Sequence, residues 1–155
     1  MNKIIATLIA GLLATAAFAQ TPAVDKAQVE ANKDVAKAEQ KEMKVDAKAD
    51  KKANKAISKA DKAHDEANAK VAVEQAKANE KVAKADPEDK AKAAAKGEKN
   101  VAKAEEKAEK KTVKADAKAI KETVDATADK ALAANKTEAV KAKSAADVKE
   151  AAAKH

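Results

Sequence analysis

The sequence predicts an all-α protein of long, solvent-exposed Ala/Lys/Glu helices without a globular core. We expect them to form a loose hairpin or coiled coil that is partly disordered in solution. Three observations lead to this. Ala, Lys and Glu dominate the chain, and all three favour helix. Beyond residue 19 only sixteen residues are apolar and larger than Ala, which is too few for a conventional core. Helix breakers are rare: the 155 residues include two Gly and two Pro.

Residues 1–19 have the pattern of a cleavable signal peptide. Lys3 gives a positive start, residues 4–14 are apolar, and Ala17, Phe18 and Ala19 form a small-residue cleavage site. We therefore expect cleavage before Gln20 and export to the periplasm. The alternative is a leader that is not removed and anchors the protein in the inner membrane.

The segment over 20–86 predicts one long helix. Thr21 is placed to cap its amino terminus, and Pro22 suits the first helical position, where no N–H is needed. Proline disfavours helical geometry at the residue before it, so Pro87 predicts that this helix ends near Ala85. Asp86 can then cap a second helix that begins at Pro87.

The segment over 87–155 predicts a broken helix. Gly97 weakens it by about 1 kcal/mol relative to Ala. Asn135 is a candidate carboxyl-terminal cap, and Thr137 is a candidate cap for a further helix. The predicted helices of the whole chain are about 22–84, 87–96, 98–134 and 138–154.

Low-complexity repeats of eleven residues are clearest over 90–122, where the chain reads KAKAAAKGEKN, VAKAEEKAEKK and TVKADAKAIKE. Eleven residues in three turns give about 3.67 residues per turn, which favours a straight or slightly right-handed apolar stripe. Acidic residues also stand four before lysines, a spacing that adds a few tenths of a kcal/mol per pair. These pairs are Glu66/Lys70, Glu80/Lys84, Asp86/Lys90, Glu88/Lys92, Glu106/Lys110 and Glu150/Lys154.

A second stripe has the alternating steps of four and three residues that are typical of a coiled-coil seam. It consists of Ala49, Ala53, Ala56, Ala60, Ala63, Ala67 and Val71. Such a seam lets two helices approach closely but drives association only weakly, so it predicts weak self-association. The alternative is that abundant alanine meets helical spacing by chance.

Residue types that carry chemistry are scarce. The chain has no Cys, Trp or Tyr, its one Phe lies in the leader, and every basic residue is Lys. His64 has Asp61 and Asn68 one helical turn away, but a lone imidazole with one carboxylate is a poor metal site. We expect a solvated histidine, no metal, no cofactor and no catalytic residue.

Charge balance argues against nucleic acid as a partner. After cleavage, 32 lysines would face 26 acidic residues, which predicts weak phosphate neutralisation. No aromatic side chain is available for base stacking. Alanine and scattered valine also form only a shallow apolar face, so binding to anionic lipid is expected to be weak.

The Ala/Lys/acid pattern over 22–154, with VAKAEEKAEKK and KADAKA, resembles the central helical region of TolA-type cell-envelope proteins. That resemblance implies a periplasmic helical spacer. The elevens over 90–122 resemble the repeats of group 3 late-embryogenesis-abundant proteins. That second resemblance implies a chain that is disordered in water and becomes helical on drying or at membranes.

We therefore expect a non-catalytic, exported, cell-envelope-associated spacer or interaction protein, with envelope proteins or anionic lipid surfaces as partners. The first alternative is a stress protectant that gains helix on drying or at anionic membranes. The second alternative is a weak binder of anionic polymers or nucleic acid.

Overall fold

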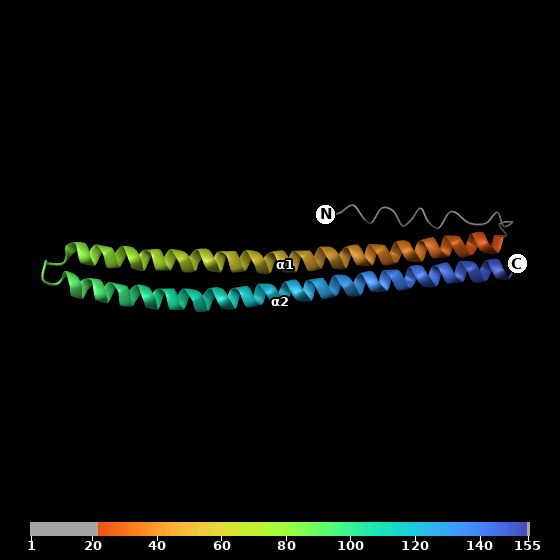
Figure 1. Ribbon diagram of the computed structural model, residues 1–155. Helices are drawn as coiled ribbons and strands as arrows, with labels where there is room; N and C mark the ends of the chain where they lie inside the picture. Colours follow the sequence, from red (N-terminus) through yellow and green to blue (C-terminus); the bar gives the residue numbers. More distant parts are fainter. Residues whose placement is uncertain (1–21, 155) are drawn as a thin grey trace. The chain divides into compact units, whose positions relative to one another are not determined.

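The computed structural model describes residues 22–154. Two helices make up almost all of this part: α1 (Pro22–Lys84) and α2 (Lys90–Ala153), with no strand among the residues described (Figure 1). The all-α class is confirmed. The predicted leader and its cleavage residues, Ala17, Ala19 and Gln20, lie outside the described residues. Within 22–154, neither helix has a stretch apolar and long enough to cross a bilayer.

The turn between the helices contains Asp86 and Pro87. The carbonyl of Asp86 accepts hydrogen bonds from the N–H of Asp89 at 2.9 Å and of Lys90 at 3.1 Å. The second of these is already an α-helical bond, so the backbone coils from Pro87, whose missing N–H is not required there. The regular helix starts at Lys90, three residues later than the sequence predicted.

The predicted breaks inside the second helix are wrong. α2 runs without interruption through Gly97, Asn135 and Thr137. Gly97 and Thr137 are both buried, so each packs against the neighbouring helix instead of ending its own. Favourable packing outweighs a propensity cost of at most about 1 kcal/mol per residue.

The chain divides into two compact units, which are described separately. The hairpin unit comprises residues 41–135, and among the described residues the end unit combines 22–40 with 136–154. In the hairpin unit the helices are antiparallel, because partners with rising numbers on α1 have falling numbers on α2. These partners are Asp50 with Lys130, His64 with Asp116, Glu66 with Lys111, and Ala78 with Gly97.

Alanines form the contact between the helices of the hairpin unit. Every member of the predicted stripe from Ala49 to Val71 is buried or half-buried against α2. Ala49 and Ala67 keep only 2% and 1% of their surface exposed. We call this line of contact, with its α2 counterpart from Gly97 to Ala133, the seam.

The seam runs straight along the helices. Its most buried alanines on α1 are Ala49, Ala60, Ala67 and Ala78, separated by 11, 7 and 11 residues. A period of seven alone is 3.5 residues per turn, and a period of eleven is about 3.67. Alternating them gives about 3.6, the pitch of an undistorted α-helix, so neither helix has to supercoil to keep contact.

Gly97 marks a close approach of the two helices in the hairpin unit. A Cβ added there would lie 2.8 Å from Cβ of Ala78, closer than packed carbon atoms tolerate. The sequence predicted that this glycine would weaken the helix. Its position shows that the missing side chain lets α1 and α2 come together.

Most of the larger apolar side chains of the hairpin unit lie outside the seam, although Val71 and Val101 lie within it. Those of the hairpin unit that are more than 40% exposed are Met43, Ile57, Val73, Val113, Ile120, Val124 and Leu132. Burial of alanine methyl groups contributes far less than burial of these side chains would. The hairpin unit is therefore held by close backbone approach and by helical hydrogen bonds, with little apolar burial.

The end unit has a different contact. Its most buried residues, Thr137 and Ser144 on α2, carry hydroxyl groups. Thr137 Oγ1 donates a long hydrogen bond of 3.4 Å to the carbonyl of Ala38. Lys141 Nζ lies 3.3 Å from Glu39 Oε1, which adds a half-exposed ion pair.

Candidate functional site

Lysine placement distinguishes one side of α1 in the hairpin unit. Each residue advances a helix by about 100°, and on this scale all twelve lysines fall in one arc of about 120° beside the seam. They are Lys41, Lys44, Lys48, Lys51, Lys52, Lys55, Lys59, Lys62, Lys70, Lys77, Lys81 and Lys84. All twelve are exposed.

The same placement recurs on α2. Ten of its twelve lysines in the hairpin unit occupy an arc of about 120° in the same rotational sense from the seam. They are Lys92, Lys96, Lys99, Lys103, Lys107, Lys110, Lys111, Lys114, Lys118 and Lys121. In an antiparallel pair, equal rotation about each helix points to the same side, so these lysines and those of α1 share one face. We call these 22 residues the lysine face.

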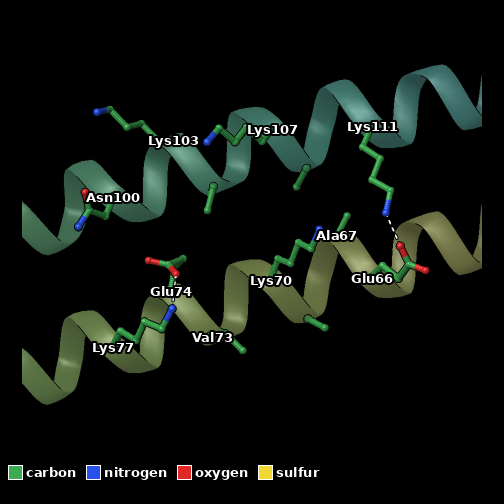
Figure 2. Close-up of a pocket in the computed structure, with 13 residues that line it drawn as sticks. Glu66, Ala67, Lys70, Val73, Glu74, Lys77, Asn100, Lys103, Lys107 and Lys111 are labelled. Atoms are coloured by element: carbon green, nitrogen blue, oxygen red, sulfur yellow. Dashed lines mark hydrogen bonds and ion pairs between the residues drawn. The ribbon is translucent and has the colours of Figure 1, made fainter.

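A groove of about 840 Å³ between the helices lies on this face (Figure 2). Ala67, Ala69, Val73, Ala104 and Ala108 give it an apolar lining, and the charged residues stand along both helices. It is lined by both helices, which places the two lysine arcs on one side of the unit.
The charged lining residues are Glu66, Lys70, Glu74, Lys77, Lys103, Lys107 and Lys111.

Two carboxylates in the groove are held by lysines. Lys111 on α2 donates to Glu66 on α1, and Lys77 donates to Glu74 at 2.8 Å (Figure 2). These hydrogen bonds, with the charge of the same lysines, lower the pKa of each glutamate. Both carboxylates therefore stay ionised at neutral pH and neutralise only part of the surrounding charge.

The lysine face remains strongly positive after such pairs are counted. The acidic residues on it or at its edge are Glu66, Glu74, Glu80, Glu106, Glu122, Asp125 and Asp129. Seven acids against 22 lysines leave a large excess of positive charge. Within the described residues, Lys70, Lys103 and Lys107 have no carboxylate within ion-pair distance.

The opposite side of the hairpin unit is acidic. Its carboxylates are Asp46, Asp50, Asp61, Asp65, Glu98, Glu105, Glu109 and Asp116. Lys130 is paired there with Asp50 at 2.5 Å, and that hydrogen bond raises the pKa of the lysine. We call these eight residues the acidic face. The two faces together explain how a nearly balanced composition produces a unit with two oppositely charged sides.

His64 belongs to the acidic side. Its Nε2 lies 2.9 Å and 3.1 Å from the two carboxylate oxygens of Asp116, with both side chains about half exposed. Helical spacing predicts Asp61 and Asn68 as the neighbours of His64. The hydrogen bond is instead made with Asp116 on α2, 52 residues away in the sequence. Among the described residues no group of three or more metal-ligating side chains is gathered.

Three of the predicted pairs with a spacing of four residues are formed. They are Glu80 with Lys84, Glu106 with Lys110, and Glu150 with Lys154. Glu66 pairs across the helices with Lys111 instead of Lys70, because antiparallel packing brings the α2 lysine within reach. Sequence analysis did not predict the lysine face. The face is defined by the angular positions of lysines about two helices, and these can be combined only when the contact between the helices is known.

Comparison with known proteins adds no relative: no family model, curated protein or solved structure matches the chain.

Proposed function

We propose that this protein is a non-catalytic, exported helical spacer or interaction protein of the periplasmic cell envelope. The observation that carries the proposal is that, in the described residues, small side chains are buried while most of the larger apolar ones are exposed, the reverse of a globular protein. Helices of 63 and 64 residues contact each other through small side chains and turn their charges and larger apolar groups outward. Most of the chain's charged and larger apolar side chains are therefore on the outer surface, where they can contact partners but cannot enclose a substrate.

Export is tested by expressing the full chain in a Gram-negative bacterium and separating periplasm from membranes. We expect the mature protein in the periplasmic fraction, with an amino-terminal sequence that begins at Gln20. An Ala19→Lys variant should block cleavage and serves as the control. A wild-type protein that begins at Met1 and sediments with membranes would contradict cleavage and favour the anchored alternative.

The envelope role is tested in the parent organism. A strain that lacks the protein should become more sensitive to detergents and to osmotic shock, and the intact gene should restore resistance. A gene with the Ala19→Lys leader should restore it poorly. Unchanged resistance under both stresses would contradict an envelope role while leaving export unaffected.

A second candidate function is stress protection by a helix that forms conditionally. The exposure of Val113, Ile120, Val124 and Leu132 favours it, because helices that bury so little apolar surface have little tertiary stabilisation. Circular dichroism should then show partial helix in buffer, a broad melt and a rise in helix on drying. A sharp melt whose midpoint rises with concentration would contradict this candidate and favour self-association.

A further inference from the structure

We propose that the lysine face of the hairpin unit is a docking surface for a planar anionic lipid membrane, used by the paired helices as a folded element. The inference deepens the non-catalytic interaction role proposed above and does not require export. It differs from conditional folding of a single amphipathic helix, because the binding charges come from α1 and α2 together. The argument rests on charge segregation, on the geometry of the face and on its side-chain chemistry.

Charge segregation removes the objection that acids nearly balance lysines. Electrostatic attraction in about 0.1 M salt decays over a Debye length of about 10 Å. A helix with its side chains is about 10–12 Å across. When the lysines touch a surface, the acidic face therefore lies roughly one Debye length farther from that surface than the lysines do. A membrane beneath the lysine face therefore meets 22 lysines and seven acids, while the repulsion from the other carboxylates is screened.

The breadth of the face favours a plane over a thread. Lysines spread through about 120° on both helices, so the charged surface covers the width of two helices, about 20 Å. A linear polymer in the groove would engage mainly the lysines on its rim, such as Lys70, Lys103 and Lys107. The straight seam keeps the charges on one side along the unit, as docking to a plane requires.

Side-chain chemistry also favours lipid. Lysine is a hydrated point charge without the bidentate geometry of arginine, and the face has no aromatic group for base stacking. Two apolar side chains, Val73 and Leu132, stand among the lysines and are 52% and 58% exposed. A lipid interface accommodates both lysine and these apolar groups, whereas a phosphate backbone gives the apolar groups no partner.

The test measures co-sedimentation of the mature chain with vesicles of phosphatidylglycerol and phosphatidylcholine, with pure phosphatidylcholine as the neutral comparison. The face variant changes six lysines of the lysine face to Gln: Lys52, Lys59, Lys70, Lys103, Lys107 and Lys114. The matched control makes the same six-charge change in the end unit: Lys26, Lys33, Lys37, Lys143, Lys149 and Lys154. Circular dichroism checks that each variant keeps its helix, and Lys→Arg at the six face positions restores the charge.

We expect wild type to bind the anionic vesicles and not the neutral ones, with affinity falling as salt rises. The face variant should bind about tenfold more weakly or worse, while the control and the Lys→Arg variant stay within about threefold of wild type. Neutralising Asp61, Asp65, Glu98, Glu105 and Glu109 should change binding by less than about threefold, because the acidic face points away.

Equal losses in the face variant and its control would show that only net charge matters and would overturn the proposal. Tighter binding to double-stranded DNA or polyphosphate than to anionic vesicles would overturn the lipid partner in favour of a polymer. Neither result affects the cleavage and fractionation experiment, so failure of this inference is distinguishable from failure of the proposed export.

Discussion

The hairpin unit and the end unit use the same two helices but differ in what they bury. In the hairpin unit the most buried residues are alanines, Val101 and Gly97, whereas in the end unit they are Thr137 and Ser144. A methyl group in a seam loses nothing on leaving water. A buried hydroxyl group must find a hydrogen-bond partner or lose free energy.

The two units also differ in charge pattern. On α1 of the end unit, charges of both signs share one side of the helix: Lys26, Glu30, Asp34 and Lys37. In the hairpin unit the 22 lysines of the lysine face and the eight acids of the acidic face occupy opposite sides. The difference shows that composition, which is similar in both units, does not determine whether a surface has a charge of its own.

Ala67→Glu should have the largest effect on this comparison. Ala67 is 1% exposed, so the longer, charged side chain would not fit between the helices and would push them apart, at a cost of about 3 kcal/mol or more. Hydrogen exchange should accelerate throughout residues 41–135. Ala72→Glu, at an exposed position on the same helix, is the control and should leave exchange nearly unchanged. Equal acceleration by both variants would mean that the seam does not hold the hairpin unit.

Gly97→Ala tests the close approach of the helices. The added methyl group would collide with Ala78, and overpacking costs about 1–3 kcal/mol, partly offset by about 1 kcal/mol of helix propensity. Gly97→Ala combined with Ala78→Gly should recover part of the loss, since the methyl group then has room. A double-mutant cycle of thermal unfolding measures this coupling. Additive effects would contradict direct contact at this point.

Ser144→Ala should stabilise the end unit and make its contact more like that of the hairpin unit, where the buried side chains are mainly alanine. The change replaces a polar residue that is 8% exposed with an apolar one and improves helix propensity, together about 1 kcal/mol. Exchange over 136–153 should slow. Ser58→Ala, at an exposed position in the hairpin unit, supplies the propensity gain alone and should give about half the effect. A larger gain from Ser58→Ala would show that the burial of Ser144 is not what weakens the end unit.

Acidification should produce the smallest effect, and it should fall mainly on the hairpin unit. Lys111 and Lys77 lower the pKa of Glu66 and Glu74, so both carboxylates stabilise the folded state at neutral pH. That stabilisation is present above the usual glutamate pKa of about 4.3 and is lost as pH falls through the lower folded-state values. Glu66 is exposed and Glu74 is only half-buried, so the loss of these two pairs should change thermal melts between pH 7 and pH 3 only slightly.
Glu66→Gln should remove part of the pH dependence and should lower stability at pH 7. A pH dependence unchanged by Glu66→Gln would assign it to other carboxylates.

Much of the fold follows from the sequence alone. Its Ala, Lys and Glu content determines the helical state, Asp86 and Pro87 locate the turn, and the spacing from Ala49 to Val71 locates the α1 side of the seam. These features depend on local propensity and on the period of one helix. His64 shows the limit, because its neighbour Asp116 comes from the other helix and no spacing along the chain indicates that contact.

Only the tertiary structure determined which residues of α2 complete the seam and on which sides of the hairpin unit the charges lie. Propensity alone predicts a helix break at Gly97 and at Thr137, but packing against the opposite helix keeps both within α2. Lysines and acids are nearly balanced when counted along the chain, yet pairing two antiparallel helices turns 22 lysines to one side. The physical reason is that the spacing of residues gives their directions about one helix only. Whether residues of two helices share a face depends on how the helices are oriented relative to each other, which packing determines.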